Sequence, residues 1–502
     1  MEKNKKEETI KFELANNVLK WYSFRTQSSV LLVGKYAKVW KTYLKSKQLD
    51  VVISDDVPKE KFDYIIICEP MIKSTEYSEV VYEYSFILNN AKKSLKKDGH
   101  ILFLVNNKFG IGLFSNKKTR AINKHSLAFT DLTELVSKTK LKSKMYYPLT
   151  DYYQTNVVFT DKYLPTTDTL NKNLEYPKCA SLLLFHQNDV YRNLIEDDAN
   201  NFKQFANSYF VDLSKDGCFD DVKYISFSSY RNKKYQLITK LTDKLVEKIP
   251  ACSEADFQIQ EMKKNIDIMK KHQLEIRDYF ENDIIKSEYI EGKTFEEYLI
   301  DLYKDKGKDE VIKEIKKYID YLKDKFVCET ILTDEQTIFA QYELNIDEEH
   351  SNKFYYIKDG LLDLIFQNIF YVDKKYYFID QEWYIENVPL EFIIFRSILH
   401  ANMLRNYISY QDLLEELDLW EYRDLFMELE IRFQDSMTDQ KFKSLFFNDN
   451  TVDNLIVTVK RQEAEIEAIT KEIERLRKNE IELQNIKGSI VYRIWRKIKY
   501  DK

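Results

Sequence analysis

Apolar residues in the first third of the chain form short continuous runs that are separated by amphipathic stretches. The runs occupy residues 29–33, 51–53, 62–67 and 101–105, and a helical pattern over 39–44 separates the first two. Continuous apolar strands that alternate with helices indicate a parallel sheet covered on both faces. We therefore predict an α/β domain over residues 1–165.

Three of these strands are followed by residues suited to a ligand. Gly34, Asp55 and Glu69 stand at or just after the ends of the first, second and third strands. In doubly wound α/β sheets, ligands bind at the carboxyl ends of the strands. We expect these residues to line a cofactor site, although an acid at this position is also an ordinary helix cap.

The pattern changes near residue 220. Short antiparallel strands are predicted at residues 223–227, 235–239 and 244–248, and a helix follows them. We predict a linker over residues 166–219 and an α+β domain over residues 220–445.

The helix after these strands carries two glutamates. Glu254 and Glu261 are seven residues, or two helical turns, apart and therefore share one face. Either could pair with Lys248, which ends the third strand. The alternative is that all three are solvated surface charges, since charged residues make up 32% of the chain.

The most informative spacing joins Asp363, Asn368 and Asp380. An Asp, an Asn five residues later and a second Asp after a short apolar hairpin follow the order of a kinase catalytic loop and metal site. In that order Asp363 accepts the proton of the attacking hydroxyl, while Asn368 and Asp380 hold Mg²⁺ against the phosphates of ATP. The alternative is a hairpin with turn-forming Asp and Asn.

Other segments of this region resemble small-molecule kinases. Lys248, in Val-Glu-Lys, has the form of the third-strand Lys that contacts nucleotide phosphates. Residues 287–291 resemble the hinge of aminoglycoside- and lipopolysaccharide-type kinases, which implies that adenine lies against Glu288 to Ile290. The same resemblance favours Glu254 as the partner of Lys248. No glycine-rich phosphate loop is present, and Arg231 occupies the corresponding turn.

The last fifty residues carry a heptad pattern. Val or Ile at a and Leu or Ile at d over residues 450–490 predict an α-helical coiled coil, and β-branched residues at a favour a parallel homo-oligomer. Aromatic and basic residues alternate over 488–502 and suit a helix in a membrane interface. The alternatives are a lone amphipathic helix and a tail that docks on protein.

Composition narrows the setting. The chain has 502 residues and a net charge of -6, so no basic field argues for nucleic acid. Five scattered cysteines without a C-x-x-C pair favour a reducing compartment. No signal-peptide core or membrane-spanning run is evident. We predict a cytoplasmic protein that associates with the inner face of the cytoplasmic membrane.

The strand order of the N-terminal region resembles class I S-adenosylmethionine-dependent methyltransferases, which have a Rossmann-like fold. Residues 21–24, 105–112 and 146–152 resemble one subfamily, related to O-antigen chain terminators, in which this fold is fused to a kinase-like domain. The resemblance implies phosphorylation of the terminal sugar of a lipid-linked polysaccharide, in partnership with glycosyltransferases.

One departure from that family concerns the loop after the first strand. It reads Gly34-Lys-Tyr-Ala-Lys-Val39 where the family has several glycines, which let the backbone approach the cofactor. We therefore predict a degenerate methyltransferase domain with weak or absent S-adenosylmethionine binding. The alternatives are an active glycan methyltransferase and a non-catalytic scaffold that organises glycosyltransferases.

Overall fold

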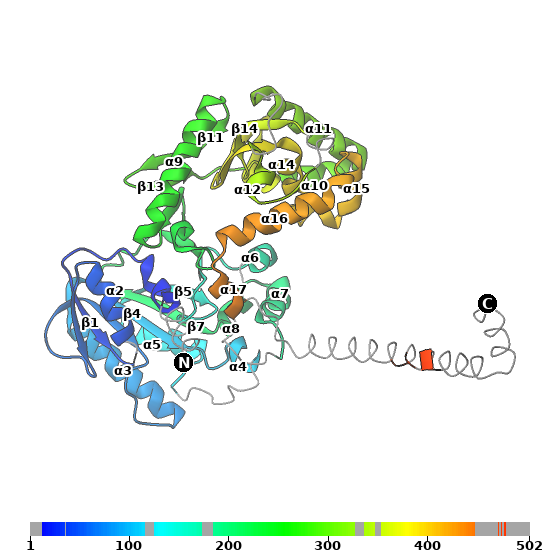
Figure 1. The fold of residues 1–502 in the computed structure, drawn as a ribbon. Helices are drawn as coiled ribbons and strands as arrows, with labels where there is room; N and C mark the ends of the chain where they lie inside the picture. The colour runs from blue at the N-terminus through cyan, green and yellow to red at the C-terminus, as the bar shows by residue number, and fades with distance from the viewer. Residues whose placement is uncertain are drawn as a thin grey trace, which may run out of the picture.

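The structure is a computed structural model that describes most of the chain. The described residues are 13–35, 37–115, 125–172, 184–326, 336–346 and 353–446, together with Thr470, Ile473, Leu476 and Arg477. Figure 1 shows one body formed by the blue and cyan segments and a second formed by the green to orange segments. We refer to residues 13–219 as the N-terminal part and to residues 220–446 as the C-terminal part.

Parallel strands form one end of the sheet in the N-terminal part. The strands β1 (Ser29–Val33), β2 (Asp50–Ser54), β3 (Phe62–Cys68) and β4 (Leu95–Asn106) lie in the order β2-β1-β3-β4 and pair in parallel. The helices α2 (Ala37–Ser46), α3 (Tyr77–Lys93), α4 (Ile111–Ser115) and α5 (Phe129–Lys138) belong to the same part. The four strands predicted from apolar runs, and the parallel pairing, are confirmed.

The segment expected to be a linker, residues 166–219, belongs instead to this fold. It contains α6 (Thr167–Lys172), α7 (Gln187–Asp197), α8 (Asn201–Phe205) and β7 (Ser208–Ser214). Strand β7 runs antiparallel between β4 and β5 (Lys142–Leu149), and all seven of its residues are buried. Its Asp212 is buried too and is stabilised by Tyr22 Oη and His100 Nδ1, each 2.8 Å from a carboxylate oxygen.

A single sheet connects the two parts. Strand β6 (Val157–Thr160) pairs with β5 on one side and with β8 (Val222–Phe227) on the other, both antiparallel. Strand β8 continues into β9 (Leu237–Thr242), β10 (Leu245–Pro250), β13 (Ile284–Glu288) and β12 (Asp278–Glu281). Within the described residues, twelve strands therefore form one continuous sheet.

The three antiparallel strands predicted after residue 220 are confirmed as β8, β9 and β10. The second begins at Leu237 rather than at Tyr235, because residues 233–235 form a short 3₁₀ turn, η1 (Lys233–Tyr235). The predicted helix consists of a 3₁₀ turn, η2 (Ser253–Ala255), and of α9 (Asp256–Lys271).

The rest of the C-terminal part is mainly helical and encloses the largest apolar core (Figure 1). Its helices are α10 (Phe295–Lys306), α11 (Lys308–Lys325), α12 (Ile338–Gln341), α14 (Leu390–His400), α15 (Tyr410–Glu416), α16 (Arg423–Met437) and α17 (Gln440–Phe446). Two hairpin-like pairs accompany them, β14 (Tyr356–Leu361) with β17 (Tyr384–Pro389) and β15 (Ile369–Val372) with β16 (Lys375–Phe378). Strand β11 (Glu275–Ile276) pairs in parallel with β16.

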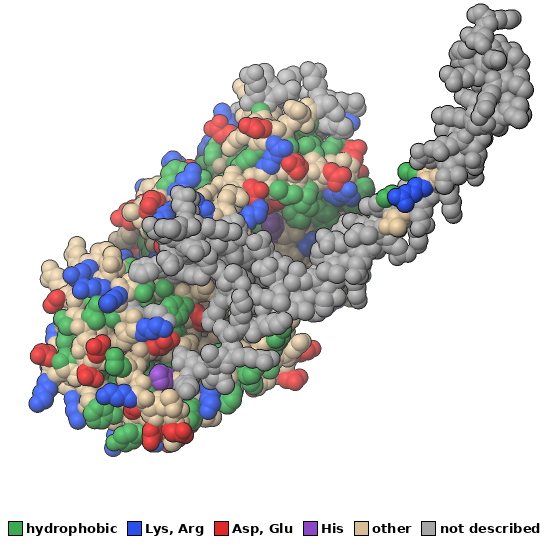
Figure 2. All heavy atoms as spheres, turned by 60° about the horizontal axis from the view of Figure 1, so that its bottom comes forward, with side chains coloured by type: hydrophobic (Ala, Val, Ile, Leu, Met, Phe, Trp, Pro, Cys, Tyr) green, Lys and Arg blue, Asp and Glu red, His purple; other side chains and the backbone are tan. Residues whose placement is uncertain are grey.

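The predicted coiled coil at 450–490 and the tail at 488–502 lie outside the described residues, apart from four helical positions. Among the residues that are described, no helix is both long and apolar enough to cross a bilayer. On the face drawn in Figure 2, basic and acidic side chains are interspersed over the described surface, in keeping with the small net charge.

Candidate functional site

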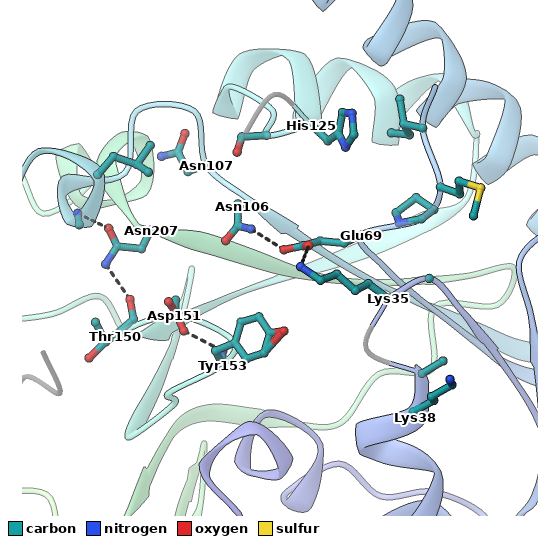
Figure 3. Close-up of a pocket in the computed structure, with 18 of the residues that line it drawn as sticks. Lys35, Lys38, Glu69, Asn106, Asn107, His125, Thr150, Asp151, Tyr153 and Asn207 are labelled. Carbon is teal, nitrogen blue, oxygen red and sulfur yellow. Dashed lines mark hydrogen bonds and ion pairs between the residues drawn. The ribbon is translucent and has the colours of Figure 1, made fainter. Parts of the chain in front are cut away.

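A cavity of about 800 Å³ lies at the carboxyl ends of β1 to β4 (Figure 3). Gly34, Asp55 and Glu69 all line it, as the strand pattern predicts. Its size lies within the range of small-molecule and cofactor sites in proteins. The N-terminal part therefore brings its three predicted residues to one cavity.

Gly34 is the one residue of the loop after β1 that the geometry requires. Its φ is +106°, and a Cβ atom added there would lie 2.1 Å from the carbonyl oxygen of Cys68. Only glycine fits so close an approach between the end of β1 and the end of β3. The remaining glycines of the family loop have no counterpart here.

Glu69 is a well-anchored acid of the cavity. Its Oε1 atom accepts hydrogen bonds from Tyr152 Oη at 2.6 Å and from Asn106 Nδ2 at 3.0 Å. Its Oε2 atom lies 3.9 Å from Lys35 Nζ, and Figure 3 shows Asn106 and Lys35 beside Glu69. The Lys35 side chain is 69% exposed. An ion pair this long and this exposed contributes little free energy.

Two lysines of the loop after β1 line this cavity. Lys35 and Lys38 are both exposed, and Lys35 extends toward Glu69 (Figure 3). The weak S-adenosylmethionine binding expected from this loop stays a prediction. Tyr36 lies outside the described residues. A cavity of this volume, with the acids Asp55 and Glu69 able to accept hydrogen bonds from hydroxyl and amino groups, fits a ligand with the size and chemistry of S-adenosylmethionine.

Sequence reasoning missed several polar residues of this cavity. Asn207, just before β7, accepts a hydrogen bond from Gly112 N at 2.6 Å and donates one to the Thr150 carbonyl at 2.7 Å. It therefore links α4 to the segment between β5 and β6. The segment was expected to be a linker, so nothing in the chain pattern singled this residue out.

A second group of charged residues lies in the C-terminal part. Lys248, at the centre of β10, contacts the carboxylates of both Asp380 and Glu382. Arg231, in the turn between β8 and β9, lies 2.6 Å from the other oxygen of Glu382. Burial would raise the pKa of Glu382, but Arg231 and Lys248 outweigh it and lower that pKa to about 2. These four residues, from three distant segments, form a charge cluster that we call the Lys248 cluster.

Asp363 adjoins the Lys248 cluster. Its Oδ2 atom accepts hydrogen bonds from the backbone N–H groups of Glu382 at 2.9 Å and Trp383 at 3.1 Å, and its Oδ1 atom lies 3.7 Å from Arg396. The residue is 7% exposed. Burial raises the pKa of Asp363 to about 7, against the opposing effect of Arg396. A carboxyl group with this pKa suits proton transfer near neutral pH.

Asn368 and Asp380, the predicted metal ligands, lie next to each other at the backbone. Ile379 N donates to the Asn368 carbonyl at 3.0 Å, and Asn368 Nδ2 donates to the Asp363 carbonyl at 3.4 Å. Within the described chain, no group of three His, Cys, Asp or Glu side chains has metal-binding geometry. Mg²⁺ in phosphoryl-transfer sites commonly uses one or two protein carboxylates together with phosphates and water. Asp380 can supply such a carboxylate, since its side chain is 40% exposed.

Asp278 is a further buried acid that the sequence did not single out. Its Oδ2 atom accepts a hydrogen bond from the backbone N–H of Asp380 at 3.1 Å, and Ser287 contacts the other oxygen. Burial raises the pKa of Asp278 to about 6. The bond helps to hold Asp380 in a left-handed conformation, with φ of +62°.

The predicted hinge forms the end of β13 and the residues after it. Glu288 and Ile290 line a cavity of about 340 Å³ together with Arg277, Val372 and Tyr377. Lys248, Asp363 and Asp380 do not line this cavity. The structure thus places the hinge beside the β15–β16 hairpin, and the adenine site stays a prediction.

The predicted pairing of Lys248 with a helix glutamate is not observed. Glu254 is exposed and is bonded to Ser253, and Glu261 is paired with Lys264. Glu254 lies in η2, before α9 begins, and the buried face of α9 presents the amides of Gln258 and Asn265 to residues 381–382. Gln258 donates to the Glu382 carbonyl at 2.8 Å, so Glu382 takes the place that a helix glutamate was expected to fill.

Neither a protein-family model nor a curated protein matches the chain. Among solved structures, choline kinase LicA from Streptococcus pneumoniae is similar at 15% identity, over 45% of this chain and 88% of that one, with a TM-score of 0.28. A streptomycin–ATP complex of APH(2")-IIa is similar at 15% identity, over 43% and 86%, with a TM-score of 0.28. An S-adenosylmethionine-dependent methyltransferase from Archaeoglobus fulgidus is similar at 14% identity, over 41% and 94%, with a TM-score of 0.25.

Proposed function

We propose that this chain is a phosphotransferase that uses ATP and Mg²⁺. The observation that supports this most strongly is the convergence of Lys248, Asp363, Asn368 and Asp380. These residues are 132 positions apart at the extremes, yet Lys248 contacts Asp380, Asp380 is joined to Asn368 through Ile379, and Asn368 contacts the Asp363 backbone. Phosphoryl transfer needs a base, a metal site and a phosphate-binding cation close together, and this convergence supports such an assignment.

In the proposed reaction each side chain has one role. Asp363 orients an acceptor hydroxyl and takes its proton, while the hydroxyl oxygen bonds to the γ-phosphorus and the bond from that phosphorus to ADP breaks. Lys248 contacts the donor phosphates. Mg²⁺ bound by Asn368 and Asp380 supplies charge neutralisation on those phosphates.

The acceptor and the setting are proposed from the sequence. The resemblance to polysaccharide-assembly proteins supports a terminal sugar of a lipid-linked glycan as acceptor and glycosyltransferases as partners. The heptad over 450–490 supports a homo-oligomer, and the tail over 488–502 supports association with the inner face of the membrane.

Metal-dependent ATP binding tests the phosphotransferase proposal without an acceptor. Calorimetry on the full chain should detect ATP binding that requires Mg²⁺, and Asp380→Ala should remove the requirement. Asp305→Asn, at an exposed position near the end of α10, is the matched control and should behave as the wild type. Absence of Mg²⁺-dependent binding in the wild type would overturn the proposal and favour a non-catalytic scaffold.

A second candidate function, methyl transfer from S-adenosylmethionine, is favoured by the cavity at β1 to β4. Its volume and its acids Asp55 and Glu69 support a cofactor that carries a ribose and an amino acid end. Calorimetry with S-adenosylmethionine should show saturable binding that Gly34→Ala removes, because the added Cβ would collide with Cys68. Gly307→Ala, where a Cβ meets nothing within 4 Å, is the control. No saturable binding would leave the domain degenerate, as the loop sequence predicts.

A further inference from the structure

Glu382 occupies an unusual place between two cations. Its Oε1 atom contacts Lys248 and its Oε2 atom contacts Arg231 at 2.6 Å. The Glu382 side chain is 7% exposed, so both contacts are shielded from water. Breaking either contact would leave a buried charge without its partner, which is strongly unfavourable.

The backbone of Glu382 is fixed from two sides. Its carbonyl accepts a hydrogen bond from Gln258 on α9 at 2.8 Å, and its N–H donates to Asp363 at 2.9 Å. The neighbouring Gln381 carbonyl accepts a bond from Asn265, also on α9, at 3.1 Å. Helix α9 therefore positions the residue that contacts Lys248, although it supplies no carboxylate itself.

The turn that carries Arg231 is held in place by backbone hydrogen bonds to residues 437–439. Asn232 N donates to the Met437 carbonyl at 2.8 Å, and Asp439 N donates to the Tyr230 carbonyl at 2.9 Å. The Arg231 guanidinium also lies 5.1 Å from the centre of the Trp383 ring. The turn between β8 and β9 is thus tied to the end of α16, which keeps Arg231 on Glu382.

Lys248 has two carboxylate partners, and only one of them is a proposed metal ligand. The Asp380 side chain is 40% exposed, whereas that of Glu382 is buried. Mg²⁺ and Lys248 would compete for the Asp380 carboxylate. A lysine that loses Asp380 to the metal still has Glu382, so it stays next to the donor phosphates.

We propose that Glu382 is a positioning residue: it keeps Lys248 in place when the Asp380 carboxylate binds Mg²⁺. The inference rests on the proposed phosphotransfer function. It assigns to Glu382, two residues after Asp380, the role that a helix glutamate was expected to have. Without Glu382, Lys248 would have Asp380 as its remaining carboxylate among the partners observed here, and the metal would have to displace it.

The test is the Mg²⁺ concentration that gives half-maximal ATP binding, measured by calorimetry on the full chain. Glu382→Gln should raise this concentration about tenfold, equivalent to ~1.4 kcal/mol. Adenosine affinity should stay unchanged, since adenosine has no phosphates, whereas general damage to the fold would weaken adenosine as well. Glu254→Gln should match the wild type, because Glu254 does not contact Lys248.

A double-mutant comparison separates this role from a simple loss of negative charge. In a Lys248→Met background, Glu382→Gln should leave the Mg²⁺ requirement unchanged, because no lysine competes for Asp380. An equal increase in both backgrounds would mean a general charge effect and would overturn the inference. So would a Glu382→Gln variant that matches the wild type.

The outcomes for the inference and for the proposed function differ. If the wild type binds ATP with Mg²⁺ but Glu382→Gln has no effect, the inference alone falls. If the wild type shows no Mg²⁺-dependent binding, both fall. If Glu382→Gln fails to fold, Arg231→Gln replaces it in the test. Without Arg231, Glu382 is free to bind Lys248, and the Mg²⁺ concentration for half-maximal ATP binding should fall. A raised or unchanged concentration would overturn the inference.

Discussion

The two candidate sites use the same kinds of residue in opposite ways. In the N-terminal part Lys35 and Glu69 both line the cavity and lie 3.9 Å apart, and the lysine side chain is 69% exposed. In the C-terminal part Lys248 contacts two carboxylates, and its side chain is 10% exposed. A ligand entering the first site displaces mainly water, whereas a ligand entering the second must exchange ion-pair partners. Burial, rather than residue type, sets this difference.

The largest expected effect concerns turnover in the C-terminal part. Asp363→Asn removes the proposed base and should lower phosphotransfer by a factor of about 10²–10⁴, the usual contribution of general base catalysis. ATP affinity should change little, because proton acceptance matters in the transition state. Turnover with a glycan acceptor and calorimetry with ATP measure the two quantities. Asp305→Asn, at an exposed position of α10, serves as control, and a loss of turnover common to both variants would contradict the role of Asp363.

The next effect compares the two lysines through stability. Lys248→Ala leaves Asp380 and Glu382 with Arg231 as their remaining cation in the Lys248 cluster and should lower the free energy of unfolding by about 3–5 kcal/mol. Lys35→Ala should change it by less than about 1 kcal/mol, because its ion pair is exposed. Urea unfolding of both variants gives the values. Similar losses for the two lysines would mean that burial does not separate the sites.

The smallest effect is a pH dependence in the C-terminal part. The pKa of Asp363 is raised from 3.8 to about 7, so the folded protein binds this proton more tightly than the unfolded chain does. That stabilisation is complete below pH 3.8 and is lost as the pH rises to about 7. Asp363→Asn should therefore gain on the order of 1–3 kcal/mol relative to the wild type between pH 4 and 7. A stability difference that stays constant over this range would show that Asp363 titrates normally.

Local sequence signals predicted strands β1 to β4 and β8 to β10, and the spacing of the site residues. The runs at residues 29–33 and 62–67 are apolar enough to identify buried parallel strands without any partner. Strand β7 was not predicted because it contains Asp212 and two serines. The burial of Asp212 depends on Tyr22 and His100, which are more than 100 residues away. Such partners are invisible in a local pattern.

Glu382 was not predicted as the partner of Lys248 for a similar reason. Glu254, Glu261 and Glu382 are the same residue type. The apolar face of α9 contains Ile259, Met262 and Ile266, and Gln258 is buried on this helix whereas Glu261 is not. Glu254 lies in η2 and Glu382 follows β16, so their positions depend on other segments. Neither residue type nor spacing contains this information.

The pairing of β6 with β8 has a consequence for the history of the chain. Val157, Val158 and Phe159 align with Ser226, Ile225 and Tyr224, so the two folds share one seam of backbone hydrogen bonds. A gene that supplied either half alone would leave an unpaired strand edge open to other chains, and such edges promote aggregation. Recombination could replace one half only with a domain whose edge strand pairs in the same register. The two halves are therefore expected to be inherited together and to change together along this seam.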